Sequence, residues 1–393
     1  MNKEQWIDKT EEGLLHVYDR YDVVLDHGEG VYLYDTDGKK YLDFASGIGV
    51  MGLGYGYPEW VDALRDQVGK VTHVSNLFYH TEAMEAASLL LEASGMEKAF
   101  FTNSGTEAIE GAIKAARKYA YTKRGRAGGE IIAFENSFHG RTIGALSVTG
   151  TQHYREPFEP LMPGVRFAEY NDIESVKKQI GPDTIAIMVE MVQGEGGVMP
   201  ASGEFAKGLK QIQDSGILII CDEVQCGMGR TGKMFAYQWY GLEPDIVTCA
   251  KALGCGVPVG AFLLNEKTAA SSLTPGDHGT TYGGNPLALR AVKTVFNIFK
   301  DKDILSHVAE MGDYLGETLE NLAKKHEEIT GVRGKGLMRG LAFRESPAGT
   351  VKKCIENGLI VITAGGNVLR MLPPLVIEKD HIDEMAAVLE KVL

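Results

Sequence analysis

The chain lacks the features of a membrane or disulfide-bonded protein. None of its apolar runs approaches the roughly 18 residues that a membrane-spanning helix needs. The first residues, "MNKEQWIDKTEEGLLHVY", form a charged amphipathic helix pattern and not a signal peptide. There are five cysteines and no C-x-x-C pair, so we expect neither a disulfide framework nor a metal site. These absences favour buried, reduced cysteines and a cytoplasmic location.

Basic residues are also in short supply. The chain has 40 Lys and Arg against 53 Asp and Glu, a formal net charge of -13. Nucleic-acid binding needs clustered Lys and Arg to neutralise phosphates, so we expect no nucleic-acid partner and no membrane partner. A local basic pocket for a small anionic molecule is compatible with this composition.

Helical and strand patterns alternate through the middle of the chain. The strand-like runs are "KAFFT", "EIIAF", "TIAIMVE", "GILIICDE" and "DIVTCAK", separated by helical patterns such as "TEAMEAASLLLEAS". This alternation predicts an α/β fold with a mainly parallel sheet between helices. A chain of 393 residues is too long for one typical core. We expect a large domain over 58–290 and a smaller α+β domain, built from the N-terminal segment 1–57 and the C-terminal part 291–393.

The stretch "GMGRTGKM" at 227–234 nearly satisfies two phosphate-binding patterns. Gly227, Gly229 and Gly232 fit G-x-G-x-x-G, and Lys233 completes G-x-x-x-x-G-K. However, Met234 stands where a P-loop needs Ser or Thr, and "CDEVQC" separates these glycines from the preceding strand. A nucleotide-binding enzyme that uses 227–234 is kept as an alternative from a different class.

Chemical groups follow three of the predicted strands. Asp222 ends "ILIICD", Lys251 follows "DIVTCA", and Ser104, Gly105 and Thr106 lie between "FFTN" and a strong helix pattern. Strand ends share one edge of a parallel sheet, and a helix N-terminus binds phosphate. A phosphate cradle, an acid for a pyridinium nitrogen and a lysine for an imine are the groups that hold pyridoxal 5'-phosphate.

At this point the sequence resembles the class III (subgroup II) aminotransferases of fold type I. The resemblance covers essentially the whole chain, and it rests on "FFTNSGTEA", "FENSFHGRT", "VEMVQGEGGV", "ILIICDEVQCGMGRTGK" and "HGTTYGGNPLA", among others. It implies a seven-stranded sheet, pyridoxal phosphate as cofactor, and a homodimer with each active site at the subunit interface. The glycine turn at 227–232 is then structural.

Within this family, "HVSNLFYH" and "GDHGTTYGGNP" most resemble enzymes of arginine biosynthesis. These move the terminal amine of N2-acetyl-L-ornithine to 2-oxoglutarate, giving N-acetyl-L-glutamate 5-semialdehyde and L-glutamate. Enzymes that act on 4-aminobutyrate, ornithine or succinylornithine are the alternatives. Ile48 stands where ornithine enzymes tend to have Tyr, which counts against free ornithine.

The resemblance also implies roles for individual residues. Lys251 and Asp222 match the catalytic lysine and the partner of the ring nitrogen. Other positions match cofactor-binding residues: Ser104, Gly105, Thr106, Phe138, Glu223, Val224, Gln225 and, from the partner subunit, Thr281.

For the substrate, Arg141 matches the residue that binds the carboxylate remote from the reacting amine, and Arg370 the one that binds the α-carboxylate of glutamate. Thr280 faces substrate. Glu195 is expected to pair with Arg370 when the ω-amine donor is bound and to swing away for glutamate, since an unpaired arginine is costly in a dry pocket.

Overall fold

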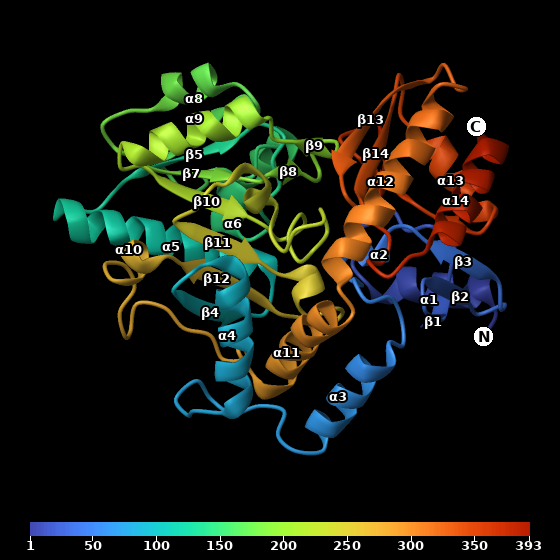
Figure 1. The fold of residues 1–393 in the computed structure, drawn as a ribbon, viewed down its shortest axis with the longest axis horizontal. Helices are drawn as coiled ribbons and strands as arrows, with labels where there is room; N and C mark the ends of the chain where they lie inside the picture. The colour runs from blue at the N-terminus through green and yellow to red at the C-terminus, as the bar shows by residue number, and fades with distance from the viewer.

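The computed structural model describes all residues from 1 to 393. A seven-stranded sheet forms the centre of one part of the molecule, and the N- and C-terminal segments lie together in the other part (Figure 1). The strand order is β4-β12-β11-β10-β7-β5-β6. The strands are β4 (Lys98–Thr102), β5 (Glu130–Phe134), β6 (Val165–Ala168), β7 (Thr184–Val189), β10 (Leu218–Asp222), β11 (Ile246–Cys249) and β12 (Gly260–Leu264).

The sheet confirms the predicted α/β class. β7, β10, β11 and β12 are buried along their whole length, as expected for strands covered on both faces. β10 is parallel to both β7 and β11, whereas β12 is antiparallel to β11 and β4. The sequence prediction lacks β6 and β12. β6 is four residues long and contains an arginine, and β12 is five residues long and begins with Gly-Ala, so neither run shows a clear strand periodicity.

Helices cover both faces of this sheet. α5 (Gly105–Arg124) packs against β4, β11 and β12, and α9 (Gly203–Asp214) packs against β10. The start of α5 is fixed by Ser104, whose hydroxyl accepts a hydrogen bond from the backbone N–H of Glu107, and its end by left-handed Gly125. The remaining helices of this part are α4 (Thr81–Ser94), α6 (Ile143–Ser147), α7 (Gln152–Arg155), α8 (Ile173–Gln179) and α10 (Glu266–Ala269).

The ends of the chain share a small sheet. β1 (Leu25–Glu29), β2 (Tyr32–Asp35) and β3 (Lys40–Asp43) are followed by β15 (Leu359–Ile360), which pairs in parallel with β3. A second sheet has the order β13-β14-β17-β16. Its strands are β13 (Ile329–Lys335), β14 (Met338–Phe343), β16 (Ile362–Ala364) and β17 (Val368–Met371), with α13 (Ala348–Glu356) and α14 (Lys379–Val392) beside them.

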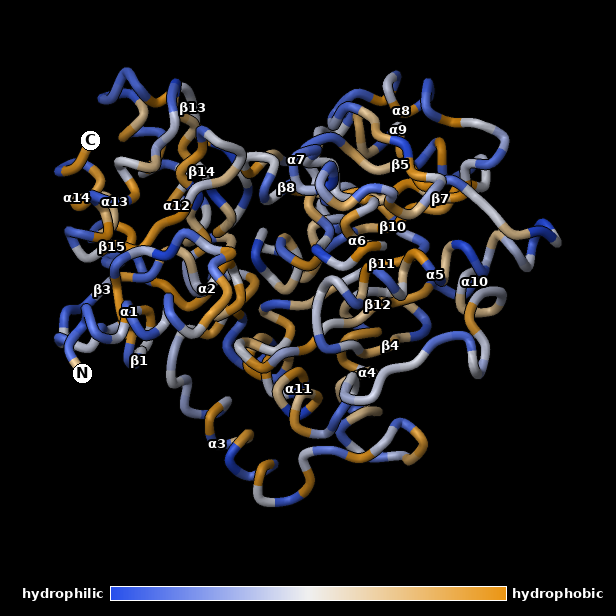
Figure 2. Tube along the Cα trace, turned by 180° about the vertical axis from the view of Figure 1, so that it is seen from behind, coloured by the Kyte–Doolittle hydropathy of each residue, from blue (hydrophilic) through white to orange (hydrophobic).

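Long helices connect the two parts. α11 (Pro286–Asp301) packs against α3 (Pro58–Val68) and α4, and α12 (Ile304–Ala323) packs against β13 and α14 (Figures 1 and 2). The predicted N-terminal helix is present as α1 (Lys3–Gly13), and it buries no residue. The other short elements are α2 (Ser46–Gly49), β8 (Val192–Gln193), β9 (Met199–Pro200) and the 3-10 turns at 156–158, 236–240 and 251–253. No helix is both long enough and apolar enough to span a bilayer.

Candidate active site

A cavity of about 450 Å³ lies where the carboxyl ends of β10 and β11 meet the N-terminus of α5. The fold brings together most of the residues singled out in the sequence. Its lining includes Ser104, Gly105, Thr106, Phe138, Arg141, Glu195, Asp222, Val224, Gln225 and Lys251.

Lys251 follows β11 and has a left-handed backbone, with φ of 51°. Such a conformation is uncommon for a residue with a side chain and is found mainly where the surrounding structure imposes it. Burial, together with the positive charge of Arg370, lowers the pKa of the Lys251 amine from 10.5 to about 8. A larger share of the amine is therefore neutral and nucleophilic near pH 7 than in a lysine exposed to water.

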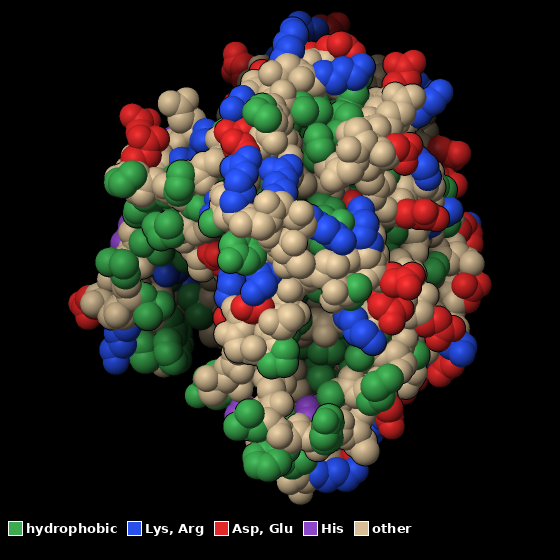
Figure 3. All heavy atoms as spheres, turned by 90° about the vertical axis from the view of Figure 1, so that its left-hand side faces the viewer, with side chains coloured by type: hydrophobic (Ala, Val, Ile, Leu, Met, Phe, Trp, Pro, Cys, Tyr) green, Lys and Arg blue, Asp and Glu red, His purple; other side chains and the backbone are tan.

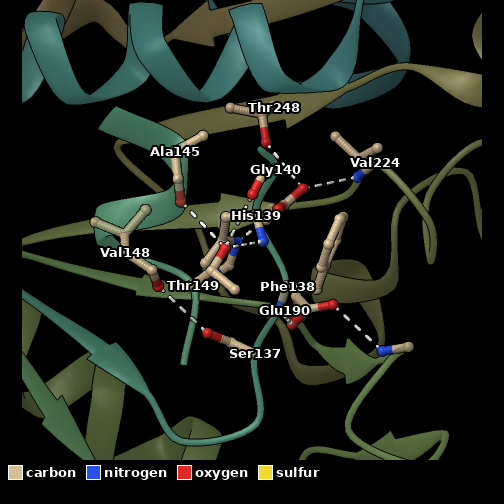
Figure 4. Close-up of polar contacts among 12 residues, drawn as sticks. Ser137, Phe138, His139, Gly140, Ala145, Val148, Thr149, Glu190, Val224 and Thr248 are labelled. Atoms are coloured by element: carbon tan, nitrogen blue, oxygen red, sulfur yellow. Dashed lines mark hydrogen bonds and ion pairs between the residues drawn. The ribbon is translucent and has the colours of Figure 1, made fainter. Parts of the chain in front are cut away.

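Asp222 ends β10, and its carboxylate is held by three donors from Val224, Thr248 and His139, which are labelled in Figure 4. Oδ1 accepts hydrogen bonds from the backbone N–H of Val224 at 3.0 Å and from the hydroxyl of Thr248 at 3.1 Å. Oδ2 lies 2.7 Å from Nδ1 of the fully buried His139. Only 4% of Asp222 is exposed. The carboxylate is thus fixed in one orientation.

His139 is a residue that sequence reasoning missed. Burial alone lowers the pKa of a histidine, but the hydrogen bond and charge of Asp222 and the charge of Glu190 outweigh it and raise the pKa of His139. A protonated His139 places a positive charge beside the carboxylate of Asp222. The motif "SFHGRT" contains this histidine, but no spacing in the sequence connects it to Asp222, which lies 83 residues later.

Sequence reasoning also missed Glu190, which lines the cavity and holds the backbone at Phe138 in place. Its carboxylate accepts hydrogen bonds from the backbone N–H groups of Phe138 and Gly194, both at 3.2 Å. Burial raises the pKa of Glu190 to about 7. This residue links the segment of Phe138 to the loop that carries Glu195.

The start of α5 forms the anion-binding end of the site. The first N–H groups of a helix have no intrahelical acceptor, and Gly105 and Thr106, which begin α5, line the cavity. A Cβ atom on Gly105 would lie 2.8 Å from Cγ1 of Val224, so only glycine fits. These N–H groups and the positive end of the helix dipole suit a phosphate.

Arg370 enters from β17, in the other part of the molecule. Its Nη1 lies 2.6 Å from Oε1 of Glu195 and 3.2 Å from Oε1 of Gln225. The Arg370 side chain is 3% exposed, whereas Glu195 is 28% exposed. The buried arginine is therefore paired with an acid that has room to move.

Arg141 also lines the cavity. Its side chain is exposed and pairs with no acid, and its Cζ lies 3.7 Å from the ring centre of Tyr154. The site therefore presents two guanidinium groups: that of Arg370 is paired with Glu195, and that of Arg141 has no acidic partner.

Glu223 belongs to the expected cofactor-binding set, and its role there stays a prediction. Its carboxylate is fully buried on the far side of the chain and accepts hydrogen bonds from the backbone N–H groups of Ala236 at 2.8 Å and Tyr237 at 2.9 Å. It does not line the cavity, because successive side chains of an extended segment point to opposite sides.

Thr280 and Thr281 do not line the cavity of their own chain either. Thr280 Oγ1 accepts a hydrogen bond from Asn103 at 3.3 Å, and Thr281 is exposed. Their expected role in the partner subunit stays a prediction.

The glycine turn joins the two parts of the molecule. Gly229 and Gly232 have φ of 79° and 92°, which glycine adopts at little cost. Between them, the fully buried Arg230 donates hydrogen bonds to the carbonyl oxygens of Leu337 and Pro373. Lys233 is exposed. None of these residues lines the cavity, so the structure gives the nucleotide alternative no support.

No cluster of His, Cys, Asp or Glu has a metal-binding arrangement.

Comparison with known proteins adds independent evidence. A sequence profile described as "Aminotransferase class-III" matches residues 16–393. An acetylornithine aminotransferase of Methanocaldococcus jannaschii is 47% identical over 100% of this chain and 98% of its own length.

Two solved structures show the same fold. The acetylornithine aminotransferase of Elizabethkingia anophelis is 33% identical, with a TM-score of 0.88 over 100% of this chain and 99% of its own. The ornithine aminotransferase of Toxoplasma gondii, whose structure has partial occupancy of PLP at the active site, is 29% identical, with a TM-score of 0.94 over 100% and 94%. With a profile match over nearly its full length and a relative at 47% identity, the chain belongs to the class III aminotransferases.

Proposed function

We propose that this aminotransferase moves the terminal amine of N2-acetyl-L-ornithine to 2-oxoglutarate, giving N-acetyl-L-glutamate 5-semialdehyde and L-glutamate, a step of arginine biosynthesis. Relatives named acetylornithine aminotransferase are 42–48% identical over nearly the full chain. Among the similar solved structures, two acetylornithine enzymes are 33% and 34% identical, and two ornithine enzymes are 29% and 30% identical. The carrying observation is the ion pair between Glu195 and Arg370, which suits a site that alternates between two unlike donors.

Class III aminotransferases use pyridoxal 5'-phosphate, and the residues of the cavity fit it. The start of α5 would hold the phosphate, and a side chain at position 105 would meet Val224. Asp222 would bind the ring nitrogen and Lys251 the aldehyde carbon, with Phe138 and Val224 against the ring. When bound, this cofactor supplies an electron sink for the carbon that carries the amine.

The protein's own groups then move protons and hold charge. The neutral amine of Lys251 takes a proton from the substrate carbon as general base, and as general acid it would then give this proton to the carbon of the cofactor that receives the amine. The ionised Asp222, supported by His139 and Thr248, stabilises a protonated ring nitrogen. Both tasks are the same in the two half-reactions.

Substrate recognition differs between the half-reactions. In both, Arg141 binds the carboxylate remote from the reacting amine, because a guanidinium fork matches a carboxylate. The α-carboxylate of glutamate would take the place of Glu195 on Arg370. N2-acetylornithine presents only CH₂ at that position, and there Glu195 keeps the buried charge paired.

The proposed assembly is a homodimer. The loop before α4 exposes Leu77, Phe78 and Tyr79, which is unusual for large apolar side chains that follow one another. Figure 3 views the molecule from the left-hand side of Figure 1, and hydrophobic side chains gather at the lower end of that face, where the loop lies. Asn76 in the same loop donates hydrogen bonds to the carbonyl oxygens of Thr280 and Gly283. The apolar surface is therefore continuous with the segment of Thr281, which we expect to complete the partner's site.

All five cysteines are free, in keeping with the proposed cytoplasmic location.

Single half-reactions test the substrate assignment. Cofactor-loaded protein is mixed in a stopped-flow instrument with one donor at a time: N2-acetylornithine, ornithine, 4-aminobutyrate, succinylornithine or glutamate. We expect acetylornithine and glutamate to remove the visible absorbance of the bound cofactor fastest. A faster reaction with another ω-donor would keep the family and replace the substrate. If no donor changes the absorbance, the reaction itself is wrong.

A further inference from the structure

The ring of Tyr154 lies against the guanidinium of Arg141. Tyr154 belongs to the short helix α7, and its ring centre is 3.7 Å from Cζ of Arg141, which is van der Waals contact. The ring of Phe138 is farther away, at 5.4 Å, and meets Tyr154 edge to face. Tyr154 is half-buried and does not line the cavity itself.

The backbone around Arg141 is anchored independently of this ring. Oε1 of Glu110, on α5, accepts hydrogen bonds from the hydroxyl of Thr142 at 2.5 Å and from the N–H groups of Gly144 at 3.0 Å and Ala145 at 3.2 Å. A Cβ on Gly140 would lie 2.1 Å from Oγ1 of Thr106, so this segment sits tightly against the start of α5. The backbone position of Arg141 is thus fixed relative to the phosphate end of the site.

The Arg141 side chain has no such anchor. It is exposed, long, and rich in rotamers, and it forms no ion pair or hydrogen bond within the chain. Arg370 differs, because Glu195 and Gln225 hold its guanidinium. Among the contacts of Arg141, the face of Tyr154 is the one close enough to select a single orientation.

Stacking of this kind leaves the recognition edge free. An arginine that lies on an aromatic face still directs its N–H donors outward in the guanidinium plane, where a carboxylate binds bidentately. An acid in place of the ring would occupy those donors and would have to be displaced by every substrate. A neutral ring orients the charge without competing for it.

We propose that Tyr154 is a positioning and specificity residue, which holds Arg141 ready for the carboxylate remote from the reacting amine in both donors. This inference rests on the proposed function, since it needs Arg141 to bind that carboxylate. Loss of the ring lets the guanidinium sample other rotamers, so carboxylate binding weakens while the chemistry at Lys251 is unchanged.

The test compares Tyr154→Leu with the matched variant Tyr154→Phe, which keeps the ring and removes the hydroxyl. Tyr121→Leu, at an exposed tyrosine of α5, controls for the loss of a surface ring. For Tyr154→Leu we expect the KM of both N2-acetylornithine and glutamate to rise about tenfold, with kcat within about twofold of wild type. Tyr154→Phe and Tyr121→Leu should stay within about twofold of wild type in both constants.

A carboxylate-free analogue separates positioning from a general structural effect. N-acetylputrescine is N2-acetylornithine without its carboxylate, and its inhibition constant can be measured whether or not it reacts. We expect Tyr154→Leu to leave this constant unchanged. An equal loss of affinity for the analogue, or an unchanged KM for both donors, overturns the inference.

Arg141→Gln distinguishes this failure from failure of the proposed function. A strong rise in KM for Arg141→Gln with none for Tyr154→Leu removes the role of Tyr154 alone. No effect of Arg141→Gln removes the assigned carboxylate site, and the role of Tyr154 with it.

Discussion

Oε1 of Glu195 lies 2.6 Å from Nη1 of Arg370, and this pair joins the loop after β8 to β17. For Glu195→Gln we expect the half-reaction with N2-acetylornithine to slow roughly tenfold, because the charge of Arg370 loses its ionised partner. The half-reaction with glutamate should keep its rate and show a lower KM, since its α-carboxylate no longer displaces an acid. Stopped-flow traces for the two donors check this. Equal slowing of both would show that Glu195 supports the loop and does not discriminate between donors.

Lys251→Ala should slow both half-reactions by about 10²- to 10⁴-fold, because the group that moves the proton is gone. Added ammonia or methylamine should restore part of the rate, as a small base can enter the space left by the side chain. Lys233→Ala is the matched control, since this lysine is exposed and the nucleotide alternative requires it. Normal turnover in Lys251→Ala would refute the mechanism, and loss of activity in Lys233→Ala would revive the alternative.

The pair of Asp222 and His139 can be separated by two variants. Asp222→Ala should lower kcat in both half-reactions about 10²- to 10³-fold, since a fixed charge aimed at the ring nitrogen is lost. His139→Gln keeps a donor toward Asp222 without the positive charge, and we expect about a tenfold loss with KM unchanged. The visible spectrum of the bound cofactor, followed against pH, checks the same point. A spectrum that titrates identically in wild type and His139→Gln would contradict the electrostatic role of the histidine.

Glu223 gives the protein a pH-dependent stability. Burial raises its pKa from the ordinary value of 4.5 to about 7. Between these two values the unfolded chain has lost the proton and the folded chain keeps it, so stability falls as pH rises from about 4.5 to 7 and then levels off. For Glu223→Gln, which cannot ionise, the stability relative to wild type should increase over this window by up to about 3 kcal/mol.

Urea unfolding at several pH values measures this difference. Asp19→Asn, at a fully exposed acid, is a suitable control and should follow wild type. A stability difference between Glu223→Gln and wild type that does not change with pH would show that Glu223 is ionised in the fold.

Complementation between inactive variants tests the shared active site. Lys251→Ala removes the base of one subunit, and Thr281→Asp places a negative charge where we expect the partner's phosphate. Each variant alone should be inactive. When equal amounts are unfolded together and refolded, half of the dimers are mixed, and each has one intact site, so about one quarter of wild-type activity should return. No recovery, with mixed dimers demonstrated by differential tagging, would mean that Thr281 serves its own subunit.

The parts of the site that sequence could predict are those tied to local structure. Asp222 and Lys251 stand at strand ends, and Ser104 caps a helix, so their positions follow from the order of elements. The side chain of Glu223 lies outside the cavity, which its place next to Asp222 indicates, because successive side chains of an extended segment point to opposite sides.

Residues whose roles depend on long-range packing could not be found in this way. His139 acquires its role from a contact with β10, and Tyr154 from the fold of a short helix over Arg141. The same holds for the fold. β12 is antiparallel to both β11 and β4, so it departs from the alternation of parallel strands and helices that the sequence predicts. The limits of the small domain at 57 and 290 stay a prediction.

The parallel pairing of β3 with β15 has a consequence for how the chain folds as it is synthesised. The Nζ of Lys39 donates a hydrogen bond to the carbonyl oxygen of Ile355, 316 residues later. The sheet that contains β3 is therefore completed only after β15 has left the ribosome. Until then β3, with its buried Tyr41 and Leu42, presents an open edge to the solvent. Newly made chains must keep this edge from pairing with one another, and their first-made segment is among the last to become native.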